Sequence, residues 1–318
     1  MVRYECLRAQ RIGRTLLSMS SDDRIGRVAI FGGTGFLGRH IAVRLAQTGI
    51  VTRVAVRNPS AVATAQGLSA VYADVRDETS VALALEGCEA AVNAVGHYVE
   101  KGAVTFPAIH ELGACNLAHQ AATLSLKCLI HISGIGANLY SPSRYVRCRA
   151  RGEVMVRDVC PATIILRPSV VFAPDDRFVN ALAAISRWTP VLPLFGSGNT
   201  RLQPVYAGDV AGAISAVLKM PHALGKTYEL GGPEICTYRD LIERILAHAG
   251  RTRLLLPVPF LVWEQLALLC SRMASPPVTK AQVTLMRSDN VVAGDSLALA
   301  DLGIAPTALS TVLPEYRF

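Results

Sequence analysis

Hydrophobic residues along the chain gather in short runs that alternate with longer stretches of mixed polarity. The runs have the length and the Val, Ile and aromatic content of buried strands, whereas the stretches between them repeat apolar residues at helical spacing. This pattern predicts strands at residues 27–31, 51–57, 69–75, 89–96, 127–134 and 162–172. It predicts helices at residues 39–49, 78–86, 105–124 and 145–159. Strands that alternate with helices in this way indicate an α/β fold with a doubly wound parallel sheet.

The strongest motif, "FGGTGFLGRH" at residues 31–40, lies between the first predicted strand and the first predicted helix. It satisfies G-x-G-x-x-G, in which glycine permits a tight turn and brings the backbone close to a pyrophosphate. The free amides at the start of the helix then meet the phosphates. We therefore predict a Rossmann-type domain. Its pyrophosphate loop would consist of Gly32, Gly33, Thr34, Gly35, Phe36, Leu37, Gly38 and Arg39.

The end of the second predicted strand indicates which dinucleotide binds. An NAD site places Asp or Glu about twenty residues after the glycine motif, where it accepts a hydrogen bond from the ribose 2′-hydroxyl. Here Arg57 stands nineteen residues after Gly38, and no acid is nearby. Arginine suits a 2′-phosphate because its planar head donates paired, charge-assisted hydrogen bonds. We predict NADP(H) as the preferred cofactor, with Arg39 as a second phosphate contact. The alternative is NAD(H), with Arg57 as a solvated charge.

The same pattern divides the chain. Residues 25–172 are predicted to form the NAD(P)-binding domain, and residues 173–318 a mixed lobe for substrate or partner, whose chain returns to the sheet. Residues 1–24 are rich in arginine and are predicted to lie outside this fold. They are either an organellar transit peptide or residues that precede a true start at Met19. The first alternative implies the mitochondrial matrix. The second implies the cytoplasm, including the inner face of the cytoplasmic membrane.

Charge and composition exclude several classes of function. The formal net charge is +8, but the basic residues are scattered and not interleaved with aromatics, so nucleic-acid binding is not predicted. The eight cysteines and seven histidines lack the spacing of a metal site or a disulfide framework. No run of 18 apolar residues predicts a transmembrane segment. Residues 254–270 are strongly apolar, and we expect a buried helix or one lying on a membrane or partner surface.

A serine, a tyrosine and an arginine form the candidate catalytic set. Ser133 ends the fifth predicted strand, and Tyr145 follows twelve residues later at a helix start. Arg149 comes four residues after Tyr145, so the two side chains share a helix face. A free tyrosine titrates near pH 10, and a neighbouring cation stabilises its phenolate. Unlike lysine, arginine stays protonated and cannot join a proton relay.

Several motifs together resemble the short-chain dehydrogenase/reductase superfamily, in its atypical, epimerase-related branch. The glycine motif, the spacing from Ser133 to Tyr145 and "LRPSVVF" carry this resemblance. The stretches "IHISGIGAN", "SPSRYVRCRARGE", "RPSVVFAPDDRFVN", "LQPVYAGDV" and "DLGIAPT" resemble more closely the nucleotide-binding accessory-subunit family of respiratory complex I and its bacterial relatives. The resemblance runs from about residue 26 to residue 318.

The resemblance implies further cofactor contacts by position. Asp74 and Val75 would flank adenine, Ala94, Val95 and Gly96 the adenosine ribose, and Pro168, Ser169 and Val170 the nicotinamide. In active members of the superfamily the serine orients the substrate carbonyl, the tyrosine donates a proton, and a lysine holds the nicotinamide ribose. This sequence keeps Ser133 and Tyr145 but has Arg149 in place of the lysine.

We therefore predict an NADP(H)-binding protein that associates with membrane-bound respiratory complex I or with quinone handling. One alternative is a free-standing NADPH-dependent reductase or epimerase that acts on a hydrophobic carbonyl, a quinone or a lipid-linked sugar. A third hypothesis is a redox sensor whose cofactor state controls a partner. These alternatives differ in whether the set of Ser133, Tyr145 and Arg149 turns over a substrate.

Overall fold

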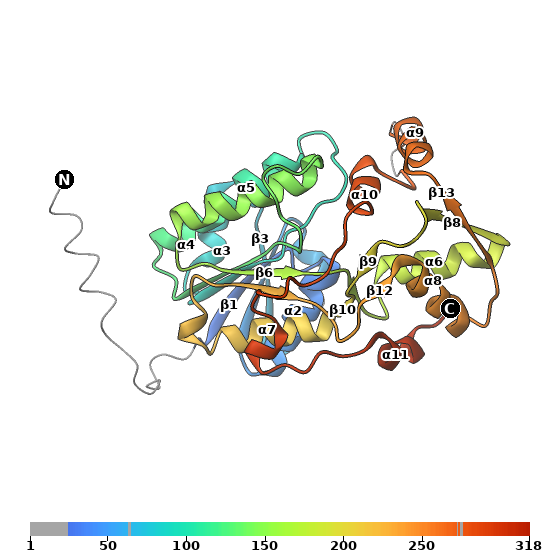
Figure 1. Ribbon diagram of the computed structural model, residues 1–318. Helices are drawn as coiled ribbons and strands as arrows, with labels where there is room; N and C mark the ends of the chain where they lie inside the picture. Colours follow the sequence, from blue (N-terminus) through green and yellow to red (C-terminus); the bar gives the residue numbers. More distant parts are fainter. Residues whose placement is uncertain (1–24, 63–64, 272, 274–275) are drawn as a thin grey trace.

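A seven-stranded parallel sheet forms the centre of the protein (Figure 1). The protein is seen in a computed structural model that describes residues 25–62, 65–271, 273 and 276–318. The strand order is β11-β6-β5-β4-β1-β2-β3. The strands are β1 (Arg27–Phe31), β2 (Val51–Val56), β3 (Leu68–Tyr72), β4 (Ala90–Asn93), β5 (Cys128–Ile132), β6 (Ile164–Pro168) and β11 (Thr227–Leu230). The order reverses direction at β1, as in a doubly wound fold, so the predicted fold class is confirmed.

Helices cover both faces of this sheet (Figure 1). One face carries α2 (Phe36–Gln47) and α7 (Ala207–Val217), which pack on the apolar side chains of β1, β4 and β6. The other face carries α3 (Glu78–Leu85), α4 (Gly113–Thr123) and α5 (Arg144–Val159). The central strands β1, β4, β5 and β6 are buried on both sides because each faces a helical layer, which explains their nearly continuous apolar sequences.

Three predicted elements differ from the structure in detail. The stretch at 254–270, expected as one helix, contains a strand, β13 (Leu254–Val258), followed by a helix, α9 (Phe260–Cys270). The helix expected at 105–124 begins with a π-helical segment, Pro107–Leu112, before α4. The strand expected at 162–172 is divided into β6 and β7 (Val171–Phe172). The break follows Pro168, which has no amide hydrogen to donate to a strand ladder. The predicted N-terminal extension, residues 1–24, lies outside the described residues.

The remaining chain forms a lobe beside the carboxyl ends of the strands (Figure 1). Its core consists of side chains from α6, α8 and the C-terminal segment. The helices are α6 (Arg177–Trp188), α8 (Tyr238–His248), α9 (Phe260–Cys270), α10 (Lys280–Leu285) and α11 (Leu309–Val312). The short strands are β8 (Val191–Phe195), β9 (Arg201–Leu202), β10 (Val205–Tyr206), β12 (Cys236–Thr237) and β13 (Leu254–Val258).

Single 3-10 turns occur in both parts of the molecule, at Pro59–Ala61, Pro221–Ala223, Leu299–Leu302 and Leu313–Glu315.

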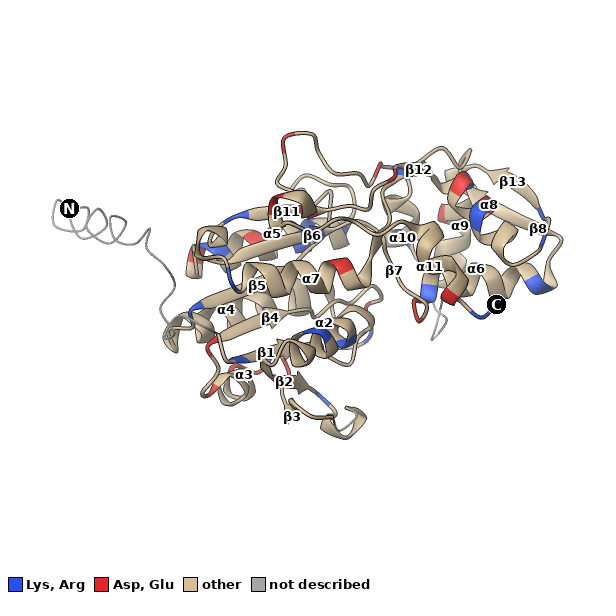
Figure 2. Ribbon diagram, turned by 90° about the horizontal axis from the view of Figure 1, so that it is seen from below, with Lys and Arg blue, Asp and Glu red and all other residues tan. Residues whose placement is uncertain are grey.

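Charged side chains are distributed over both parts of the molecule. Among the described residues, Figure 2 shows Lys and Arg interspersed with Asp and Glu along the elements. Within the part of the chain that the structure describes, no helix combines the length and apolarity needed to cross a bilayer.

Candidate dinucleotide site

The glycine loop between β1 and α2 requires glycine for steric reasons. Gly32 has φ of 82°, a left-handed conformation that other residues avoid. A Cβ atom at Gly38 would collide with the carbonyl oxygen of Gly32, so α2 can pack this closely only on glycine. Helix α2 begins after Gly35, which offers no capping side chain. The first amides of α2 therefore lack a side-chain partner and point to an anionic ligand.

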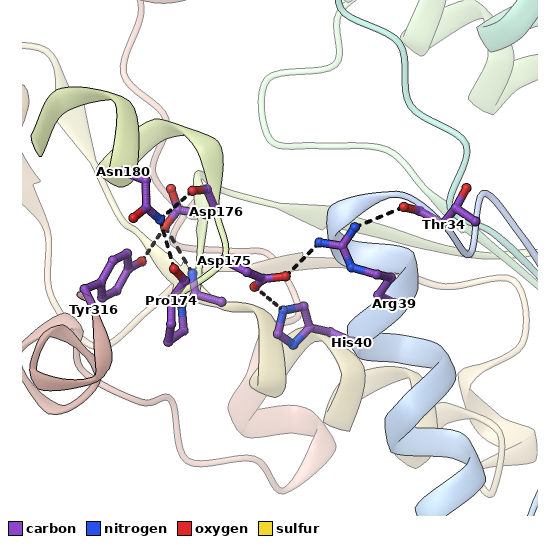
Figure 3. Close-up of polar contacts among 9 residues, drawn as sticks. Thr34, Arg39, His40, Pro174, Asp175, Asp176, Asn180 and Tyr316 are labelled. Atoms are coloured by element: carbon purple, nitrogen blue, oxygen red, sulfur yellow. Dashed lines mark hydrogen bonds and ion pairs between the residues drawn. The ribbon is translucent and has the colours of Figure 1, made fainter. Parts of the chain in front are cut away.

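Arg39 makes a contact that the sequence did not indicate. Its guanidinium lies 2.8 Å from Oδ2 of Asp175 and donates a hydrogen bond to the Thr34 carbonyl at 3.1 Å (Figure 3). His40 approaches Oδ1 of the same carboxylate at 2.8 Å. Asp175 stands just before α6, so this cluster joins the start of α2 to the C-terminal lobe. The phosphate contact expected of Arg39 stays a prediction, and it would require the guanidinium to share or leave Asp175.

Arg57 and Asp74 follow the adjacent strands β2 and β3. Arg57 is exposed, and it makes no hydrogen bond or ion pair with any residue in the described ranges. Asp74 pairs with Arg76 at 2.5 Å, and this hydrogen-bonded arginine lowers the pKa of the Asp74 carboxyl. The charge of Arg57 also helps to lower the pKa of Asp74, but the two side chains form no ion pair, so the donors of Arg57 remain available to a ligand.

The other predicted contacts lie at the same edge of the sheet. Ala94, Val95 and Gly96 follow β4, and the Ala94 carbonyl lies against the Cα of Gly32. Pro168, Ser169 and Val170 join β6 to β7, and Ser169 donates a hydrogen bond to the Asn290 side chain at 2.6 Å. The predicted loop and strand-end residues therefore all gather at the carboxyl edge of the sheet, where doubly wound folds bind dinucleotides.

Ser133, Tyr145 and Arg149 meet at this edge as well. Ser133 follows β5, and Tyr145 lies in the first turn of α5, whose N-cap is Ser143. Arg149 donates a long hydrogen bond of 3.4 Å to the Tyr145 hydroxyl, and its guanidinium carbon lies 5.3 Å from the ring centroid. The guanidinium rests directly on Gly134, where a Cβ atom would collide with it.

Two buried polar atoms of this cluster have no hydrogen-bond partner among the described residues. They are the Ser133 hydroxyl and Nη2 of Arg149. Buried polar atoms are normally satisfied, so such orphans indicate a polar ligand. The ribose hydroxyls and the carboxamide of a nicotinamide nucleotide supply suitable groups. The unfilled helix start and these orphaned atoms together fit an NAD(P) molecule along the sheet edge.

Aromatic rings enclose the tyrosine. Tyr98, Phe106 and His110 each lie with ring centroids 5.3 to 5.4 Å from that of Tyr145, which is only 3% exposed. Burial raises the pKa of Tyr145, and Arg149 opposes this only in part. Burial also lowers the pKa of His110 to about 4, so that histidine is neutral at pH 7. The phenol therefore keeps its proton at neutral pH and can donate a hydrogen bond.

Sequence reasoning missed Tyr98, Phe106 and His110 as neighbours of the tyrosine, because they lie 35 to 47 residues away in the chain. For Tyr98 a signal existed. It follows β4 by five residues, and the predicted strand already placed that segment at the ligand-binding edge. For Phe106 and His110 the sequence offers no comparable sign, since both belong to the segment around the π-helical turn.

Comparison with known proteins gives consistent results. A model of the NAD dependent epimerase/dehydratase family matches residues 28–231. The chain is 31% identical over 289 residues to the Mus musculus mitochondrial protein named NADH dehydrogenase (ubiquinone) 1 alpha subcomplex subunit 9, covering 88% of this chain and 76% of the relative. It is 30% identical over 205 residues to a ceramide reductase of Caulobacter vibrioides, covering 64% of each.

Among solved structures, the fold resembles an NADPH-dependent quinone oxidoreductase of Escherichia coli complexed with NADPH. The TM-score is 0.72 at 20% identity, and the match covers 91% of this chain and 99% of that structure. At this identity the likeness shows the fold alone. The family match and the glycine loop together support binding of a nicotinamide dinucleotide.

Proposed function

Because the chain belongs to the NAD-dependent epimerase/dehydratase family, we propose that it is an NADP(H)-binding protein of the complex I accessory-subunit type. In this proposal the nucleotide is held structurally, and the protein associates with respiratory NADH:quinone oxidoreductase or with quinone handling. The relative in mouse, whose name makes it a subunit of NADH dehydrogenase, supports the association. Its mitochondrial name favours the matrix side, and the cytoplasmic face of a bacterial membrane is the alternative.

The enclosure of Tyr145 is the observation that carries the structural role. Tyr145 is buried among three rings, and its hydroxyl lies beside a cation that cannot give up a proton. A substrate carbonyl would have to displace one of these rings to reach the phenol. A bound reduced nicotinamide would supply a hydride. The residues present favour a different role, in which Arg149 and Ser133 hold the ribose of the nucleotide and no path is open to a substrate.

The free cation at Arg57 supports NADP(H) as the nucleotide. The exposed guanidinium follows β2, on the side of the glycine loop where a 2′-phosphate would lie. Asp74 pairs with Arg76 and forms no ion pair with Arg57.

The structural role is tested by pairing nucleotide affinity with turnover. We expect NADPH to bind without measurable oxidation by a panel of quinones, ketones and aldehydes. Arg149→Ala should weaken NADPH binding, since it removes the buried group that faces the ribose. Arg151→Ala is a matched control, because its guanidinium is largely exposed and pairs with Glu111 at 3.7 Å. Brisk turnover that Tyr145→Phe abolishes would contradict the proposal.

The association is tested separately. Gentle solubilisation of the source membranes should co-purify the chain with complex I. Recovery of the chain wholly in the soluble fraction at low salt would contradict this part of the proposal and favour a free-standing enzyme.

A reductase acting on a hydrophobic carbonyl is the second candidate. The specific observation in its favour is that Ser133 has a buried hydroxyl without a partner among the described residues, at the same edge of the sheet as a tyrosine that keeps its proton. This is the arrangement that orients and protonates a carbonyl oxygen. The Caulobacter relative, named a ceramide reductase, supports a lipid-like substrate for this alternative. Arg149→Lys distinguishes the two, because a reductase should gain turnover from it and a structural binder should not.

A further inference from the structure

Helix α9 is more apolar on its outer side than on its inner side. Leu261, Val262, Leu266, Leu268 and Leu269 have exposed fractions between 41% and 78%. At 3.6 residues per turn these five side chains fall, with Gln265, within an arc of about 160°. A helix at a protein surface normally turns charged and polar residues toward water. The outward face of α9, defined by these five residues, has no charged side chain.

The inner side of α9 fixes the helix in place. Trp263 donates a hydrogen bond to the Leu194 carbonyl at 2.9 Å and stacks on Phe195, with ring centroids 4.4 Å apart. Ala267 packs with Val278 and Val283 in a small buried cluster. These inner contacts fix the rotation of α9, so the outward face cannot turn toward the protein. It is held toward solvent at the rim of the lobe (Figure 1).

A contiguous apolar surface of this kind indicates a binding surface. The exposed Leu254 and Leu256 of the neighbouring strand β13 extend its apolar character. Three occupants compete for it: a lipid bilayer, a second copy of the chain and another protein. The size of the face and the charge of the surrounding sequence distinguish between these three occupants.

The outward face is small for a protein partner. The outward face consists of five side chains on a helix about 16 Å long. A stable protein interface draws about 20–30 residues from each partner, with matched shapes. A bilayer needs neither a minimum area nor a matched shape. The helix also falls well short of the roughly 30 Å of a hydrocarbon core, so it suits a position in the interface plane.

The sequence on either side of the helix is net basic, which suits an anionic membrane. Residues 245–288 contain five basic residues and a single acid, Glu264. That acid lies on the inner side of α9 and pairs with Arg287 at 2.8 Å. Apolar burial and attraction to anionic headgroups together set the strength with which such helices bind lipid. We propose that α9 docks the protein on an anionic bilayer surface through its outward face.

Docking through α9 brings the candidate site close to the lipid. Helix α10 packs on α9 through Val283, and on the cluster of Phe106, Tyr145, Val146 and Cys148 through Ala281 and Leu285. One short helix thus separates the outward face from the buried tyrosine. This inference goes beyond nucleotide binding and does not depend on which nucleotide the protein holds.

Vesicle co-sedimentation tests the proposal with the full chain. We expect the protein to pellet with phosphatidylcholine vesicles that contain phosphatidylglycerol, and to bind several-fold more weakly to phosphatidylcholine alone. The double variant Leu268→Asp, Leu269→Asp should lower the partition coefficient at least about tenfold. The control is Leu83→Asp on α3, a leucine 55% exposed, which should leave partition unchanged. Melting temperature and NADPH affinity should be the same in all three proteins.

Any other outcome either assigns the outward face to a different occupant or refutes the proposal. A wild-type chain that stays in the supernatant with both vesicles would refute lipid docking. Equal partition of the double variant and the wild type would show that another surface binds. A wild-type dimer in light scattering that the double variant converts to monomer, without vesicle binding, would assign the face to a second copy. Loss of co-purification with complex I, again without vesicle binding, would assign it to a protein partner. Loss of NADPH binding alone would count against the proposed function and not against the docking surface.

Discussion

Replacing Arg57 by alanine should abolish the preference of this protein for NADPH over NADH. In the structure Arg57 is exposed at the end of β2, without a hydrogen bond or ion pair to any described residue. No existing contact has to break when a 2′-phosphate arrives. Hydrogen bonds to charged groups contribute about 1.5–3 kcal/mol each. Solvent screening at an exposed strand end favours the lower limit of that range.

The expected preference is therefore at least about tenfold, equivalent to about 1.4 kcal/mol. Fluorescence titration of the wild type and of Arg57→Ala with both nucleotides measures it. The variant should lose about tenfold in NADPH affinity and change little in NADH affinity, because NADH has no 2′-phosphate. Arg44→Ala is the matched control, since it removes an exposed arginine from the last turn of α2, far from the glycine loop.

Two results would refute this reasoning. Equal affinities of the wild type for the two nucleotides would show that Arg57 is only a solvated charge. An Arg39→Ala variant that loses NADPH affinity while Arg57→Ala keeps it would assign the phosphate to the arginine that now pairs with Asp175.

Three further substitutions test the fold around the site. Gly38→Ala should abolish nucleotide binding in a titration and lower the melting temperature, because its Cβ atom collides with the backbone of the glycine loop. Tyr316→Phe removes the hydroxyl that donates to buried Asp176 (Figure 3), so calorimetry should show a loss of about 1–2 kcal/mol, whereas Tyr140→Phe, at a residue 91% exposed, should show none. Burial lowers the pKa of His131 to about 4, so its stabilising effect is complete above pH 6.5 and is lost as pH falls toward 4. The pKa of His110 is lowered to the same value, so urea unfolding at pH 5 should show a loss of about 4 kcal/mol relative to pH 7.5, about 2 kcal/mol from each histidine, and His131→Gln should show about half of that loss.

The sheet and the glycine loop could be predicted because their signals are local. Each strand is a short apolar run whose neighbours in sequence form the adjacent helix. The glycines act within a single turn, where Gly38 meets the backbone of Gly32. Arg57 could be placed at the ligand edge for the same reason, since a strand end fixes the position of the residue that follows. Pattern and spacing were sufficient for these features.

The partners of the site residues could not be predicted, because they depend on contacts between distant segments. Arg39 and Asp175 are 136 residues apart, and Tyr316 reaches Asp176 across 140 residues. The neighbouring carboxylates therefore bind different partners: Asp175 pairs with Arg39 at the start of α2, and Asp176 is the N-cap of α6. Only the folded chain shows which acid meets which partner.

The exchange of lysine for arginine at residue 149 is part of the local packing. The guanidinium lies against Gly134, in space that a Cβ atom would occupy. One of its nitrogens donates a hydrogen bond to Tyr145, and another has no partner among the described residues. Its charge stabilises whatever electron-rich group lies there, and its permanent proton prevents a relay. The ring cage around Tyr145 acts in the same direction, because burial favours the neutral phenol. Under the proposed function, the cation and the rings would together hold a nucleotide more readily than they would transfer a proton.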